Sequence, residues 1–169
     1  MLLYDPVGIP SFIQRWKEFG EKEKESVFRF FCYYTAFNFL YNRGKTRCVN
    51  CDLCDNIVCL CKELQLHDDK CQVCNAIRNI IGEEQDFNPF EVLTPQSEII
   101  TQPVFRQRKV MYGDCSLVNI QALFLNIYQI RCNLYHGSKE MRGLRDKALV
   151  KEAADVLELF LNYVVDKYN

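Results

Sequence analysis

The sequence predicts an all-α protein, and three observations support this fold class. Apolar residues recur at the three- and four-residue spacing of helices in three long stretches, 12–41, 117–136 and 149–165. Little of the chain alternates apolar and polar residues as a half-buried strand does. Gly44 and Gly137 stand where two of these helices would stop. With 169 residues, 49% of them apolar, the chain is expected to form a single domain with a substantial core.

The N-terminal third predicts one or two long helices that are rich in aromatic residues. Ser11 is the expected N-cap of a helix over residues 12–19, which ends before Gly20. The charged residues 21–25 are expected to form a solvated turn. A second helix then covers residues 27–41, where apolar side chains follow helical spacing.

Most large apolar and thiol side chains of the predicted helices are interpreted as core residues. This applies to Trp16 and to the phenylalanines of residues 28–39. The same interpretation is given to three cysteines that lie within helical patterns, because a thiol behaves as a small apolar group: Cys32, Cys115 and Cys132.

The last third predicts two helices joined by a short turn. Asp114 or Ser116 is the expected cap of a helix that runs to His136, and residues 137–139 form the turn. The final helix is expected to start at Asp146 or a neighbour, and the two helices are expected to pair antiparallel. The preceding stretch contains three prolines, which predict an irregular connection with room for one short turn: Pro89, Pro95 and Pro103.

Charge and composition restrict the compartment and the partners. The net charge of −1 gives no overall basic field, so any nucleic-acid binding must come from a local patch. No signal peptide is evident, and no uncharged apolar run is long enough for a membrane span. We therefore expect a cytoplasmic protein without a membrane partner. Its ten cysteines then favour metal binding or reduced thiols over a disulfide framework.

Arg131 and His136 form the most informative motif of the sequence. They stand five positions apart at the end of an apolar-periodic stretch, and Gly137 follows them. A permanent cation beside a group that titrates near neutral pH suits phosphodiester cleavage without a metal. Asn133 could bind the phosphate or the histidine, and Tyr135 could stack on an exposed base. The alternative interpretation is two ordinary polar residues at a helix end, where the helix dipole favours His136.

Residues 127–139 (IYQIRCNLYHGSK) resemble the Arg-x(4–6)-His signature of the HEPN superfamily. Residues 31–42 (FCYYTAFNFLYN) are similar to the first long helix of many members, and Arg145-Asp146 fits the usual start of the last helix. The resemblance covers residues 11–43 and 114–165 and implies an all-α helical bundle.

The resemblance also implies a function and a set of partners. Many HEPN members are metal-independent endoribonucleases that act as homodimers in toxin–antitoxin or anti-phage systems, and others are inactive binding modules. Carried over to this chain, Arg131 and His136 match the two defining positions at a dimer cleft, and together with Asn133 they are the expected catalytic residues. Cleavage of single-stranded RNA would leave a 2′,3′-cyclic phosphate. The implied partners are a second copy, RNA, and a cognate antitoxin or regulatory protein. Active members often have a polar residue directly after the arginine, where this chain has Cys132.

Residues 45–86 form a cysteine-rich insert that the resemblance does not cover. Cys51-x2-Cys54-x16-Cys71-x2-Cys74 has the paired spacing of a four-thiolate site, so we expect a structural zinc ion. An iron–sulfur cluster and ordinary buried thiols are the alternatives. Four further residues have no assigned role: Cys48, Cys59, Cys61 and His67.

Basic residues near the motif are candidates for RNA binding. Lys139 follows the histidine, and Arg106, Arg108 and Lys109 form a cluster in the irregular stretch. The cluster is either a solvated loop or a strip that contacts phosphates.

Two alternative functions follow from the sequence patterns. One is a catalytically silent module that binds a protein or a nucleotide, and the other is a zinc-dependent nucleic-acid adaptor that uses the helices as a scaffold.

Overall fold

The described residues of the computed structural model form helices and connecting segments. The structure describes residues 9–42, 72–82, 87–94, 97, 100, 110–135 and 143–168. Its helices are, in chain order, α1 (Ile9–Lys22), α2 (Ser26–Asn42), α4 (Gln72–Ile81), the 3₁₀ turn η1 (Pro89–Glu91), α6 (Leu117–Tyr135) and α7 (Leu144–Tyr168). No strand occurs in these ranges. The all-α prediction is therefore confirmed for them, as is the short turn within the proline-containing connection.

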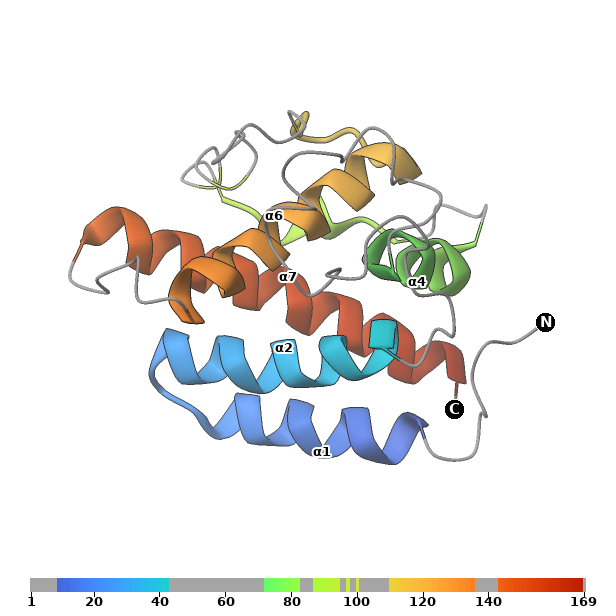
Figure 1. Ribbon diagram of the computed structural model, residues 1–169, viewed down its shortest axis with the longest axis horizontal. Helices are drawn as coiled ribbons and strands as arrows, with labels where there is room; N and C mark the ends of the chain where they lie inside the picture. Colours follow the sequence, from blue (N-terminus) through green and yellow to red (C-terminus); the bar gives the residue numbers. More distant parts are fainter. Residues whose placement is uncertain are drawn as a thin grey trace, which may run out of the picture.

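The helices pack in two levels around α2 (Figure 1). α1 and α2 form an antiparallel pair, and α7 packs along α2 and touches α1. α6 crosses above this group, and α4 packs against both α6 and α2. The expected pairing of the last two helices is only part of this arrangement. α6 and α7 run in opposite senses and touch where they cross, but α7 makes its most extensive contact with α2.

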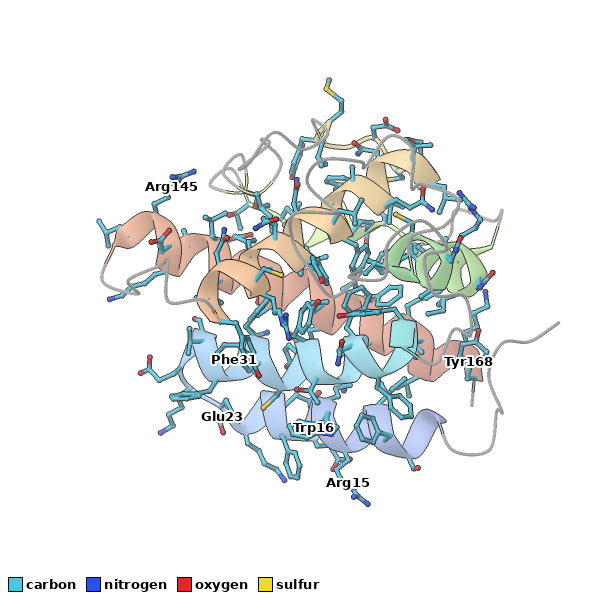
Figure 2. The ribbon with its side chains drawn as sticks, in the orientation of Figure 1. Arg15, Trp16, Glu23, Phe31, Arg145 and Tyr168 are labelled. Carbon is cyan, nitrogen blue, oxygen red and sulfur yellow. The ribbon has the colours of Figure 1, made fainter. Side chains whose placement is uncertain are left out.

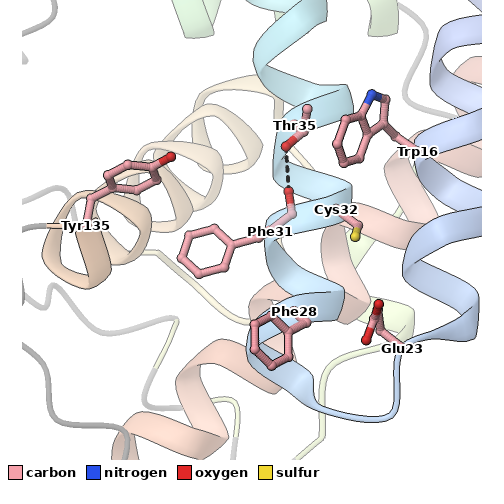
Figure 3. A pocket seen from close by; sticks show the side chains of 7 residues that line it. All are labelled: Trp16, Glu23, Phe28, Phe31, Cys32, Thr35 and Tyr135. Carbon is pink, nitrogen blue, oxygen red and sulfur yellow. Dashed lines mark hydrogen bonds between the residues drawn. The ribbon is translucent and has the colours of Figure 1, made fainter.

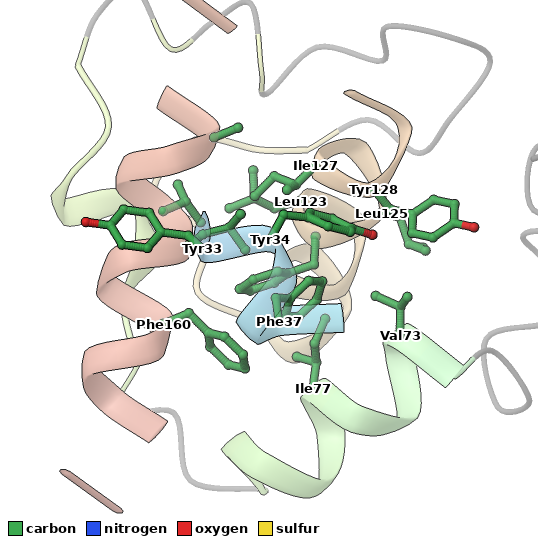
Figure 4. Packing of buried hydrophobic residues seen from close by; sticks show 14 of the residues in the cluster. Tyr33, Tyr34, Phe37, Val73, Ile77, Leu123, Leu125, Ile127, Tyr128 and Phe160 are labelled. Carbon is green, nitrogen blue, oxygen red and sulfur yellow. The ribbon is translucent and has the colours of Figure 1, made fainter. Parts of the chain in front are cut away.

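Aromatic rings hold the two levels together (Figure 4). Phe37 of α2 is fully buried and lies between α6 and α7. Its ring centroid is 5.2 Å from that of Phe124 and 5.8 Å from that of Phe160, and the latter two are 4.7 Å apart. Rings at these separations add about 0.5–1.5 kcal/mol per pair to the stabilisation from burial alone. The position of α6 relative to α2, which determines where the Arg131 end lies, is therefore fixed by packing.

Helix α1 starts earlier and ends later than predicted. Ser11 lies inside the helix rather than at its N-cap, and the helix continues through Gly20 to Lys22. Gly20 is buried against the ring of Tyr33, and a Cβ at this position would lie only 2.7 Å from Cδ1 of that ring. Gly20 thus allows α1 and α2 to approach closely, and it does not end the helix. The predicted solvated turn is confirmed only for residues 23–25: all of residues 21–25 are exposed, but residues 21 and 22 belong to α1.

The predicted start of α6 is confirmed, and that of α7 shifts by two residues. The Ser116 hydroxyl accepts a hydrogen bond from the backbone N–H of Asn119 at 3.4 Å, as an N-cap does. α7 begins at Leu144, and the carbonyl of Gly143 accepts from the N–H of Lys147 at 3.1 Å. Asp146 therefore lies in the first turn of α7, where its negative charge interacts favourably with the positive end of the helix dipole.

The end of the cysteine-rich insert belongs to the core of the bundle. Helix α4 buries an apolar face that includes Val73, Cys74 and Ile77. The side-chain amide of Gln121 on α6 donates to the backbone carbonyl of Cys74 at 3.1 Å. Residues 72–81 are thus an integral part of the bundle, whereas residues 45–71 of the insert lie outside the described residues.

Ion pairs tie α2 to α7 at the edge of the core. The Arg29 guanidinium donates to Asp155 at 2.7 Å and also pairs with Glu158. Both carboxylates are partly buried, so this pairing is screened less than a surface ion pair.

Among the described helices, none is long and apolar enough to cross a membrane.

Candidate functional site

Arg131 lies on the last turn of α6, where its guanidinium rests on two tyrosine rings. The guanidinium carbon is 4.4 Å from the ring centroid of Tyr135 and 5.7 Å from that of Tyr34. Tyr135 follows Arg131 by four residues on the same helix face, and Tyr34 comes from α2. Such cation–π contacts contribute about 0.5–2 kcal/mol each and restrict the side chain to one region. Arg131 is therefore positioned before any ligand arrives.

The charge of Arg131 is not neutralised by an acidic side chain of the described residues. Its only described polar contact is a weak hydrogen bond to the thiol sulfur of Cys132 at 3.9 Å. Burial tends to lower the pKa of Arg131, but its neighbours, first Cys132, raise that pKa above its ordinary value. The side chain is thus a half-buried permanent cation whose forked donors suit a phosphate.

Tyr135 is the exposed outer member of this cluster. Its side chain is 67% exposed, and its ring meets that of Phe31 edge-on at a centroid distance of 5.8 Å. The ring thus contacts both Arg131 and Phe31 of α2. Stacking of Tyr135 on a nucleic-acid base stays a prediction.

Asn133 is not brought beside Arg131. Residues two apart on a helix are about 200° apart around its axis, and Asn133 accordingly faces the protein interior. It is 9% exposed, and its carboxamide oxygen accepts a hydrogen bond from Gln129 at 3.0 Å. Its contacts in the structure are thus those of a packed polar residue.

A groove with a volume of about 520 Å³ opens next to Tyr135 (Figure 3). We call it the aromatic groove, and the residues that line it come from three segments. α1 and the following turn supply Trp16 and Glu23, and α6 supplies Tyr135. The floor is one face of α2 at the spacing i, i+3, i+4, i+7: Phe28, Phe31, Cys32 and Thr35. Trp16, Glu23 and Phe31 lie near one another on α1, the turn after it and α2 (Figure 2).

The aromatic groove corrects part of the core assignment. Phe28 is 56% exposed, and Trp16, Phe31 and Cys32 are only half-buried, whereas Phe37 is fully buried as predicted. The sequence signal for the groove was an apolar surface on every side of the α2 helix. Only part of such a surface can face the core, so the excess side chains line the groove.

The remaining core assignments of cysteines have mixed outcomes. Cys132 is fully buried, as predicted. Cys115 instead lies half-buried just before α6, where its thiol donates to the side-chain oxygen of Asn88 at 3.0 Å.

Two polar groups of the aromatic groove, Thr35 and Glu23, present hydrogen-bond acceptors, whereas the N–H of Trp16, the O–H of Tyr135 and the S–H of Cys32 are donors. The Thr35 hydroxyl donates its proton to the Phe31 carbonyl at 2.8 Å, which leaves its oxygen as an acceptor. Glu23 is a carboxylate, also an acceptor. Burial, and then the negative charge of Glu23, raise the pKa of the Cys32 thiol. The charge of Glu23 therefore acts on the groove floor.

Most of the other predicted site residues lie outside the described residues. These are the histidine and basic candidates His136, Lys139, Arg106, Arg108 and Lys109, and the thiols Cys51, Cys54 and Cys71. Cys74, the fourth expected zinc ligand, is fully buried on α4. Within the described part of the chain, no three metal-ligating side chains lie together. The zinc site remains a prediction.

The described geometry combines an oriented cation, an exposed tyrosine and an aromatic groove that contains a carboxylate at one end of α6. This combination is suited to binding a ligand that carries an anionic group and a flat ring. No family model, no curated protein and no solved structure matches this chain.

Proposed function

We propose that the chain is a metal-independent endoribonuclease that cleaves single-stranded RNA, as its resemblance to the HEPN superfamily implies. The observation that carries the proposal is the state of Arg131. It is a half-buried cation at a helix end, held by two tyrosine rings and not paired with a described carboxylate. A guanidinium held in this way can bind the non-bridging oxygens of a phosphodiester while negative charge builds on them.

The proposed chemistry assigns His136 the proton transfers. Its imidazole takes the proton of a ribose 2′-hydroxyl, which attacks the phosphorus, or gives a proton to the departing 5′-oxygen. His136 follows Tyr135 directly in the sequence. A second copy of the chain would supply a second motif across a shared cleft. The proposed setting is a toxin or anti-phage effector that an antitoxin or regulatory protein controls.

The proposed zinc ion has a structural role in this account. Cys51, Cys54, Cys71 and Cys74 would hold it, and Cys74 lies in the core beside α6. A metal bound by these thiolates would tie the insert to the bundle and would take no part in cleavage.

The second candidate function is a catalytically silent HEPN-like module that binds a protein or nucleotide partner. One observation favours it. The position after Arg131, often polar in active members, is Cys132, and its side chain is fully buried in the core. This position therefore supplies no polar group to a cleft.

An RNA cleavage assay separates the two candidates. Purified protein is incubated with unstructured RNA in EDTA, and we expect cleavage by the wild type and none by His136→Ala. A general acid–base group contributes about 10²–10⁴-fold to a rate, so its removal lowers cleavage below detection. His67→Ala, which changes the only other histidine, is the matched control and should cleave normally.

The same preparations report on fold and metal. The far-ultraviolet circular dichroism of each sample, taken in the assay buffer, checks that EDTA and the substitutions leave the helices intact. Metal content before EDTA treatment tests the zinc prediction. RNA binding without cleavage by well-folded wild type would favour the silent module.

A further inference from the structure

The aromatic groove lies beside the end of α6 that carries Arg131, and the proposed cleavage chemistry does not use it. It lies directly against Tyr135, whose other neighbour is the Arg131 guanidinium. We propose that the aromatic groove is a base subsite that selects guanine, next to the phosphate that Arg131 holds. This inference rests on the proposed function and adds a substrate preference to it.

The shape and lining of the groove suit a flat heterocycle. Its volume of about 520 Å³ falls within the range of about 300–1,000 Å³ that small-ligand sites occupy. Four of its seven lining side chains are aromatic: Trp16, Phe28, Phe31 and Tyr135. Stacking of a base on an aromatic side chain contributes about 1–3 kcal/mol in single-strand binding proteins.

The polar groups of the groove narrow the choice of base. The two oxygens of the Glu23 carboxylate can accept two hydrogen bonds, so the best partner for this residue presents two adjacent donors, and the Thr35 oxygen is a further acceptor elsewhere in the groove. Guanine does so with N1–H and the N2 amino group on its Watson–Crick edge, and a carboxylate can accept both. Adenine and cytosine pair one amino donor with a neighbouring acceptor. Uracil has one N–H between two carbonyls. Each of the other three bases would therefore place an acceptor near the Glu23 carboxylate.

A cationic ligand is the main competitor, because aromatic residues and a carboxylate also bind ammonium groups. The position of Arg131 argues against it. Its guanidinium is 4.4 Å from the Tyr135 ring centroid, so a second cation at Tyr135 would meet like charge. A nucleotide brings its own anionic phosphate and so complements both Arg131 and the acceptors of the groove.

The single tryptophan of the chain provides a direct probe, because Trp16 lines the groove. Its fluorescence, excited near 300 nm to avoid nucleotide absorption, is titrated with GMP, AMP, CMP and UMP. We expect saturable quenching by GMP at a concentration at least tenfold below that of the other three. In Glu23→Gln this preference should fall at least tenfold. Glu18→Gln, which removes an exposed charge on α1 outside the groove lining, should retain the preference for GMP.

A further variant separates the subsite from the proposed cleavage. Arg131→Met should weaken binding of all four nucleotides while the preference for GMP persists, because the phosphate and base contacts are distinct. If the protein prefers GMP but does not cleave RNA, the result would contradict the proposed function and would still support the guanine subsite. Cleaving protein that binds the four nucleotides equally, or none of them, would overturn the subsite. Quenching by tetramethylammonium at lower concentration than by GMP would also overturn it.

Discussion

Replacing Arg131 with lysine is expected to lower kcat/KM for RNA cleavage by about 10²-fold or more, although the positive charge is kept. An ammonium group is a point charge and cannot make the two parallel hydrogen bonds of a guanidinium to phosphate oxygens. It also stacks less well on the rings of Tyr34 and Tyr135 that now hold Arg131 in place. Loss of one preorganised donor at a developing negative charge typically costs about 10²–10³-fold.

The Arg131→Lys result needs a control for stability and one for charge. Thermal unfolding should change by no more than about 1 kcal/mol, since the lysine stem still covers the ring of Tyr34. Arg15→Lys is the matched variant. Arg15 is exposed on α1 and lies outside the aromatic groove and the Arg131 cluster (Figure 2), so its cleavage rate should match the wild type. Full activity of Arg131→Lys would mean that Arg131 does not bind the phosphate in the transition state.

Replacing Gly20 with alanine is expected to lower the free energy of unfolding by about 2 kcal/mol. The new Cβ would overlap the ring of Tyr33, which is fully buried and cannot move without disturbing the core. Overpacking of this kind costs about 1–3 kcal/mol and exceeds the gain of up to about 1 kcal/mol from better helix propensity. Urea unfolding followed by circular dichroism measures the difference.

Two further variants test the cause of the Gly20→Ala effect. Lys22→Ala, an exposed change on the same helix, should stay within about 0.5 kcal/mol of the wild type. In a Tyr33→Leu background the cost of Gly20→Ala should shrink, because the ring atoms that it meets are gone. A stabilising Gly20→Ala would contradict the close approach of α1 to α2. Since α1 carries Trp16, the loss of that approach should also disturb the aromatic groove.

Helical periodicity predicted the approximate positions of α1, α2, α6 and α7, because their apolar residues recur at three- and four-residue spacing, but it did not predict α4. The sequence also predicted Asp114 or Ser116 as the cap of α6, since capping is a local interaction, and Ser116 is the one that caps it. The role of Gly20 could not be found in this way. Glycine is needed at this position because of the contact with Tyr33, which lies thirteen residues further along the chain. The local sequence pattern shows only that glycine is a poor helix former.

The candidate site was predicted in part. The Arg131 motif drew attention to the end of α6, and Tyr135 lies beside Arg131 as a stacking residue would. The groove was missed because nothing in the α2 sequence distinguishes the exposed Phe28 from the buried Phe30. That difference depends on where α1 and α6 pack. Asn133 faces the interior because it lies across the helix from Arg131.

The most direct test of the account is cleavage of an oligoribonucleotide in EDTA, compared with the same strand carrying one 2′-deoxynucleotide at the cleavage site. If a 2′-hydroxyl is the nucleophile, with His136 and Arg131 acting without a metal, the ribose strand is cut and ends in a 2′,3′-cyclic phosphate. The substituted strand then stays intact at that position. Cleavage at the 2′-deoxynucleotide, or cleavage only when Mg²⁺ is restored, would contradict the proposed reaction.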